Sequence, residues 1–344
     1  MLARKPSNAL LVNVTPNFVH VARLGRPDDR PLTVDAMTEL ALDDELGLAS
    51  WIRREFREET RWITGYCGFH PKGRVLVRDT LIPRRLEEPG YLAGIVSTLA
   101  RVDAQRDWQL AALEAESGRA FAAEGTPRPG LIVGVAKTDV RTFQQSLIAL
   151  NIRPRRLEVG TLPALGSAGS IHALNGTEQA LAVCEIEADE TRIYILARNG
   201  LHTQPILPCG LRTIEEAAMK EFGCADLPTA RRRLDQHDEE LQRHERRLMR
   251  LFARHLRLSF DYFEHQTGQI IGAMHCCHLP ASRGWVAKSL ASAVDVPSIE
   301  PDIVAWAHRT GLELATPPPS AAWLGTLGLV ADLTPLASDH APAA

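Results

Sequence analysis

Residues 181–207 read LAVCEIEADETRIYILARNGLHTQPIL, which is three short apolar runs separated by two turn-forming clusters. The first cluster is acidic, and the second contains Asn199-Gly200, a dipeptide typical of tight β-turns. The stretch therefore predicts three consecutive strands, and a helical pattern follows it up to residue 222. Residues 10–24, LLVNVTPNFVHVARL, begin the chain in the same way, with a turn at residues 15–17.

A β-β-β-α order is thus predicted twice, over residues 10–60 and 181–222. Two related α/β lobes would explain this duplication, and we expect them at residues 1–175 and 176–344, the second with a closing C-terminal helix. Helical patterns between residues 91 and 121, followed by a β-α-β pattern, predict a small α+β subdomain inserted in the first lobe at about residues 83–158. A doubly wound sheet without duplication is the alternative.

The overall composition is that of an ordinary soluble globular protein. The chain has 344 residues, 45% of them hydrophobic, and a net charge of −3. These values exclude a disordered or collagen-like chain and give no sign of nucleic-acid binding. The apolar runs are too short to cross a bilayer, and the six cysteines form no CxxC pair. We therefore expect a cytoplasmic protein with reduced thiols.

Three further stretches carry a resemblance to a known family. They are VGVAKTDVRTFQQSLIALNIRPRRLEV at residues 133–159, the helix ending RHLRLSFDYFEHQTG at residue 268, and SAAWLGTLGLVADL at residues 320–333. In these the chain resembles the actin-like type IV pilus assembly protein PilM, and more distantly FtsA and the cytoplasmic part of the type II secretion protein GspL. The resemblance implies a two-lobed actin-like fold of the actin/Hsp70/hexokinase type, in which three turns hold a nucleotide between the lobes.

The three turns that match the family's nucleotide site depart from its pattern. In the first, Pro16 removes a backbone donor and Phe18 stands where a small residue belongs. The second is an acidic hairpin, expected to be solvated, whose charges would repel a phosphate by on the order of 4 kcal/mol per close pair. In the third, cysteines replace the glycines that allow close approach of the backbone. The degenerate positions are Asn13, Thr15, Asn17, Glu185, Glu187, Asp189, Cys276 and Cys277.

No catalytic residue, cofactor or metal site is therefore predicted. The run His275-Cys276-Cys277-His278 contains good zinc ligands, but four adjacent residues cannot readily surround a tetrahedral ion. No P-loop, dinucleotide-binding or nucleophile motif is present. We expect Glu185→Ala to leave the melting temperature nearly unchanged.

The resemblance implies a cytoplasmic scaffold, a pseudo-ATPase of a type IV pilus or type II secretion-like inner-membrane platform. Its implied partner is the short cytoplasmic N-terminal segment of a PilN-like inner-membrane protein, through which alone the scaffold would reach the membrane. Residues expected to line the binding groove are Val133, Val135, Val140, Phe143 and Leu147.

Other functions stay open from the sequence. A divergent actin-like ATPase or phosphotransferase would bind ATP with Mg²⁺ and use Glu185 as its surviving acid. A free-standing filament-forming protein or other homo-oligomer is a further alternative. The arginine-rich segment 231–257 predicts either a solvated helix face or a docking surface for acidic groups.

Overall fold

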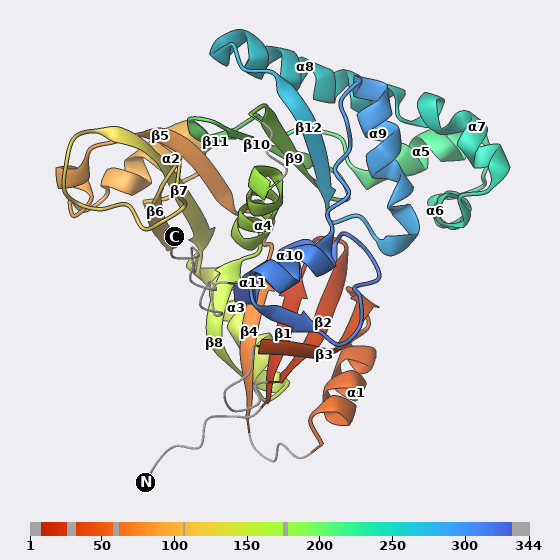
Figure 1. Ribbon diagram of the computed structural model, residues 1–344, viewed down its shortest axis with the longest axis horizontal. Coiled ribbons are helices and arrows are strands. Elements are labelled where there is room, and N and C mark those ends of the chain that lie inside the picture. Colours follow the sequence, from red (N-terminus) through yellow and green to blue (C-terminus); the bar gives the residue numbers. More distant parts are fainter. Residues whose placement is uncertain (1–7, 26–31, 58–61, 106, 175–177, 332–344) are drawn as a thin grey trace, which may run out of the picture.

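The computed structural model describes residues 8–25, 32–57, 62–105, 107–174 and 178–331. Within them, the first lobe is built on a six-stranded sheet of order β13-β3-β2-β1-β4-β8 (Figure 1). Strands β1, β2 and β3 are antiparallel, whereas β4, β8 and β13 join their neighbours in parallel. The strands are β1 (Asn8–Val14), β2 (Phe18–Gly25), β3 (Leu32–Ala41), β4 (Ile63–Phe69), β8 (Ile152–Val159) and β13 (Leu312–Leu314).

The second lobe repeats this arrangement with a four-stranded sheet of order β11-β10-β9-β12. Its strands are β9 (Ala180–Ile186), β10 (Thr191–Ala197), β11 (Gly200–Thr203) and β12 (Ile271–Cys277). As in the first lobe, an antiparallel meander is extended by a parallel strand next to its first strand. The helices of this lobe are α5 (Leu211–Glu221), α6 (Leu227–Gln236), α7 (Glu239–Leu248), α8 (Arg250–Thr267) and α9 (Trp285–Val294). The predicted duplication is therefore confirmed.

The central strands β1 and β9 are buried on both faces, which explains their nearly continuous apolar sequence. Leu10 and Val12 face a core beneath α1 (Glu45–Glu55), whereas Leu11 faces a core that also contains Leu181 of β9. Helices α4 (Thr161–Leu174) and α11 (Trp323–Ala331) fill this shared core between the lobes. They pack closely, because a Cβ at Gly328 would lie 2.4 Å from Ser167 Oγ.

A third sheet, of order β5-β7-β6, projects from the first lobe together with α2 (Figure 1). Its elements are β5 (Val75–Leu81), α2 (Tyr91–Ala100), β6 (Trp108–Glu114) and β7 (Arg128–Ala136), and a short 3₁₀ turn, Pro83–Arg85, precedes α2. The helical prediction for residues 91–121 is wrong for β6, whose local sequence WQLAALE favours a helix. Antiparallel pairing with β7 overrides that preference.

The strand pairing gives the inserted subdomain and the second lobe other boundaries than those predicted from the sequence. β5 belongs to the inserted sheet, whereas α3 (Lys137–Ala149) leads into β8 of the first lobe, so the insertion spans about residues 75–136 and not 83–158. After β12 and a 3₁₀ turn at Ala281–Arg283, the chain returns to the first lobe through α10 (Ile303–Arg309), β13 and α11. The second lobe is therefore not the whole of 176–344, because β3 and β1 need C-terminal elements to cover them. The predicted ends at residues 60 and 333 lie outside the described residues.

Candidate functional site

The three turns singled out in the sequence meet between the lobes. Asn17, in the β1–β2 turn, donates from Nδ2 to the carbonyl of Ile186 at 2.9 Å and to that of His278 at 2.7 Å. The Thr15 hydroxyl holds this turn by accepting from the backbone amides of Asn17 and Phe18. One side chain of the first lobe thus links two turns of the second.

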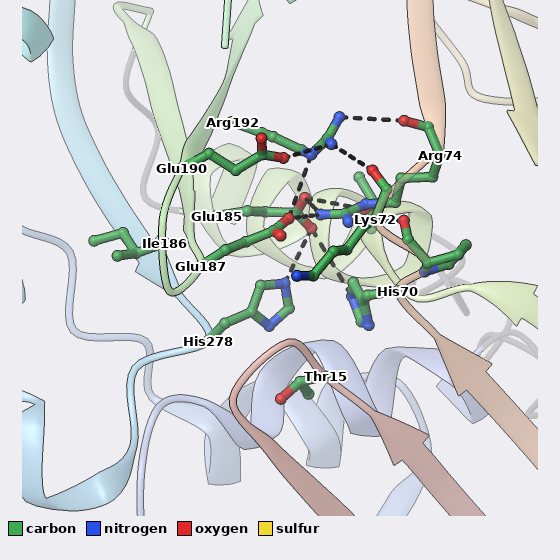
Figure 2. Close-up of polar contacts among 12 residues, drawn as sticks. Thr15, His70, Lys72, Arg74, Glu185, Ile186, Glu187, Glu190, Arg192 and His278 are labelled. Atoms are coloured by element: carbon green, nitrogen blue, oxygen red, sulfur yellow. Dashed lines mark hydrogen bonds and ion pairs between the residues drawn. The ribbon is translucent and has the colours of Figure 1, made fainter. Parts of the chain in front are cut away.

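A buried arginine joins the lobes a second time (Figure 2). Arg74, at the start of β5, donates from Nη2 to Glu185 at 2.8 Å and to Glu187 at 2.7 Å, and from Nε to the Thr161 hydroxyl at 3.0 Å. Its side chain is 2% exposed and that of Glu185 is fully buried. Such a pair is stable only if every charged group keeps its partner.

Arg192 completes the network from β10. Its Nε donates to Glu187 at 3.3 Å, and its Nη2 donates to Glu190 at 2.7 Å and to the carbonyl of Lys72 at 2.8 Å (Figure 2). Its Nη1 donates to the carbonyl of Arg74 at 3.2 Å. The acidic hairpin is therefore neutralised from the first lobe and from its own strand.

This pairing corrects the expectation of a solvated acidic hairpin. Burial alone would raise the pKa of Glu185, but the Arg74 guanidinium and a hydrogen bond from His278 hold that pKa well below its usual range. Glu187 is also buried and paired. Among the predicted site acids, only Asp189 lies near the surface, in an exposed pair with Arg212.

The backbone carbonyls of the acidic hairpin also have hydrogen-bond partners. Helix α5 begins directly against it, so that the amides of Leu211 and Arg212 donate to the carbonyls of Glu187 and Ala188 at 2.9 and 2.8 Å. Gly210 permits this approach, since a Cβ there would lie 2.4 Å from the Glu187 oxygen. Amides at a helix start are the usual donors to phosphate, and these two already have acceptors.

Two histidines approach the remaining oxygen of Glu185. His278, just after β12, lies with Nε2 3.1 Å from Glu185 Oε1, and His70, just after β4, lies with Nε2 3.9 Å from the same atom (Figure 2). Burial is the main reason that the pKa of His70 falls well below its ordinary value. His278 adopts φ = 64°, an uncommon backbone conformation for a non-glycine residue.

The other predicted nucleotide positions lie within the strands. Asn13 is buried in β1 and donates to Thr326 of α11 at 3.1 Å. Cys276 and Cys277 end β12, and both are buried. A contact with Cys184 and burial raise the pKa of Cys276, and burial raises that of Cys277, so both stay protonated thiols.

A groove of about 1200 Å³ lies apart from this network, between the inserted sheet, α3, α4 and β8. Val133, Val135 and Val140 line it, as the sequence analysis expects for its binding groove. Phe143 does not line it but stacks on Phe69, which does, with ring centroids 4.9 Å apart. Leu147 packs in the first-lobe core, because it lies about two helical turns beyond Val140 along α3.

Sequence reasoning missed the first-lobe half of the polar network. Arg74 is not among the predicted site residues, and His70 follows β4, a strand for which the sequence gives no prediction. One signal is local: His70 stands between the apolar run ending at Phe69 and Pro71, where a strand ends and side chains can converge.

No protein-family model and no curated protein matches the chain. A solved structure titled PilM-PilN type IV pilus biogenesis complex matches with a TM-score of 0.69 over 95% of this chain and 98% of that chain, at 13% identity. The fold is actin-like. The resemblance to PilM is thereby confirmed at the level of the fold.

Two more distant structures match over similar lengths. The ethanolamine utilization protein EutJ from Carboxydothermus hydrogenoformans has a TM-score of 0.50 at 9% identity, covering 95% of this chain and 90% of that one. The cytoplasmic domain of EpsL, an inner-membrane component of the type II secretion system of Vibrio cholerae, has a TM-score of 0.45 at 10% identity, with 96% of each chain covered. Across the described ranges, no helix is both long and apolar enough for a membrane span.

Replacing Arg74 should show how strongly the buried network supports the fold. In Arg74→Met, Glu185 and Glu187 lose their shared cation inside the protein, and we expect the free energy of unfolding to fall by about 3–5 kcal/mol. Glu185→Ala should also destabilise the protein, contrary to the sequence-based expectation. Urea denaturation measures the free energy of unfolding of both variants. Arg212→Met, which breaks an exposed pair, should cost less than about 1 kcal/mol, and an equal cost for the two arginines would refute this account.

Stability should fall in mild acid because of buried neutral histidines. Burial lowers the pKa of His275 from 6.5 to about 4. Between these values the unfolded chain binds a proton that the folded chain does not, so the free energy of unfolding drops as the pH is lowered, by up to about 1.4 kcal/mol per pH unit. Urea denaturation at about pH 7 and pH 5 should show a smaller loss for His275→Gln than for wild type. The exposed His308→Gln variant should keep the wild-type dependence, and unchanged behaviour of His275→Gln would contradict the prediction.

Proposed function

We propose that this protein is a non-hydrolysing actin-like scaffold of a type IV pilus or type II secretion-like assembly platform. In this function it binds the short cytoplasmic tail of a PilN-like inner-membrane protein and reaches the membrane through that partner. The observation that carries the proposal is the open groove beside the inserted sheet, together with an interlobe site already filled by the protein's own side chains.

The groove has the size and the lining that an extended peptide requires. Its volume of about 1200 Å³ exceeds the roughly 300–1,000 Å³ of small-molecule pockets. Its walls are mainly apolar, with Leu113, Leu131, Leu162 and Trp306 beside the three valines. Such a lining favours a segment that carries several apolar side chains.

Two sheet edges border the groove. Within the described chain, β6 is an edge strand of the inserted sheet and β8 is an edge strand of the first-lobe sheet. Both strands contribute residues to the groove lining. An extended tail can pair its backbone with an edge strand while alternate side chains enter the groove. This geometry supports a peptide ligand over a compact metabolite.

The interlobe site supports the absence of ATP hydrolysis. Asn17 links the β1–β2 turn to the acidic hairpin by a hydrogen bond. Arg74 pairs with Glu185 and Glu187, the carboxylates that would otherwise be available to hold a metal-bound water. The amides at the start of α5 are engaged too. ATP would have to displace all of these contacts before it could bind.

The competing function is a divergent ATPase or phosphotransferase. Glu185 is in place as an acid at the end of β9, and the histidines beside it are unusual for a purely structural cluster. Isothermal titration of the protein with ATP and Mg²⁺ decides between the two functions. We expect no binding in the micromolar range, and micromolar affinity would refute the pseudo-ATPase proposal.

Groove variants test the scaffold proposal directly. The ligand is a synthetic peptide of the N-terminal cytoplasmic segment of the candidate partner, a single-span membrane protein to be sought in the neighbouring reading frames. Val140→Asp places a carboxylate in the apolar groove and should weaken peptide binding at least tenfold, as measured by fluorescence anisotropy. Ile148→Asp, on an exposed part of the same helix, should stay within about twofold of wild type.

Equal binding by both variants would show that the peptide binds elsewhere. No binding by the wild-type protein would contradict the partner proposal.

A further inference from the structure

We propose that His70, Glu185 and His278 form a binding site for one divalent transition-metal ion, of which Zn²⁺ is the natural probe. The ion would join the two lobes, because His70 comes from the first lobe and the other two ligands come from the second. This site is independent of the groove and of any tail bound there. It also runs against the sequence-based expectation that the chain has no metal site.

The first support is the donor set. Each of the three buried residues offers one ligand atom, and these atoms all lie within 4.8 Å of one another. The separations from Glu185 Oε1 are 3.1 Å to His278 Nε2 and 3.9 Å to His70 Nε2. Around a tetrahedral zinc with bonds of about 2.0–2.1 Å, ligand atoms lie about 3.3 Å apart, so small side-chain shifts suffice.

The second support is an unsatisfied nitrogen. His70 Nδ1 lies 3.0 Å from the carbonyl of Val14, which can only accept, so Nδ1 carries the proton and Nε2 carries a lone pair. That Nε2 is buried without a hydrogen-bond partner and faces Glu185. A buried polar atom without a partner is costly, and a metal-binding histidine characteristically donates its other N–H to a backbone carbonyl.

The third support is that the two carboxylate oxygens of Glu185 have different partners. Oε2 accepts from Arg74 at 2.8 Å and from the Thr161 hydroxyl at 3.0 Å, whereas Oε1 faces the two imidazoles. Hydrogen bonds to the distal oxygen orient the carboxylate without blocking the proximal one. The imidazole rings of His70 and His278 are held edge to face, with centroids 4.4 Å apart, so both nitrogens can face one ion (Figure 2).

Binding of this ion requires a change of tautomer at one residue only. Without metal, His278 Nε2 carries the proton that it donates to the ionised Glu185. With metal, that proton moves to Nδ1 through solvent, and the Nε2 lone pair binds the ion. His70 needs no change. Since burial keeps its pKa well below the ordinary value, its imidazole is neutral, as a ligand must be.

The test uses untagged full-length protein treated with EDTA and desalted. Titration calorimetry with Zn²⁺ alone should give one equivalent bound with micromolar or tighter affinity. His70→Gln and His278→Asn should each weaken this binding at least tenfold, asparagine being chosen because it tolerates the positive φ at position 278. His275→Gln removes a buried imidazole of the same segment outside the triad and should bind like wild type.

Co²⁺ provides a readout that does not depend on the variants folding. Wild-type protein with one equivalent of Co²⁺ should develop intense visible ligand-field absorption, and one equivalent of Zn²⁺ should abolish it. Absence of this absorption in the folded wild type, or Zn²⁺ affinity equal in the triad variants and in His275→Gln, would overturn the proposal.

Discussion

The buried guanidinium of Arg74 is the interaction on which the arrangement of the two lobes depends. It lies in the residue directly before β5, yet it pairs with Glu185 and Glu187, which belong to the second lobe. None of these groups is solvated, so each would be strongly unfavourable without the others. Because the charges are satisfied only when the lobes are together, the network holds the interlobe space closed and fixes where its turns lie.

The closed interlobe space and the open groove beside the inserted sheet differ in their chemistry. The space between the lobes is polar and filled, with Asn17 and Arg192 bonded to backbone oxygens across it. The groove is apolar and open, and it lies where the inserted sheet leaves the first lobe. In the function proposed above, a partner would bind at the insertion while the two lobes stay in one relative position.

Local patterns identified the turn residues of both lobes in the interlobe site but missed Arg74 and His70. Thr15, Asn17, Glu185 and Glu187 were found because each lies in a turn whose residue types are characteristic by themselves. Their pairing was not found, and neither were the histidines as a group. The hairpin therefore looked solvated, although the structure neutralises and buries it. β6 was assigned to a helix for a similar reason, since pairing with β7 is invisible in a local window.

The sequence by itself determined the duplicated order of strands and helices and the turns of the two repeated units, because strand periodicity and turn chemistry act over a few neighbouring residues. The two-sided burial of β1 and β9 agrees with their nearly continuous apolar sequences. Only the tertiary structure decided which side chains share a site. Arg74 and Glu185 are separated by 111 residues, and His278 lies another 93 beyond Glu185. Packing of the two lobes brings them together, and no local preference encodes that contact.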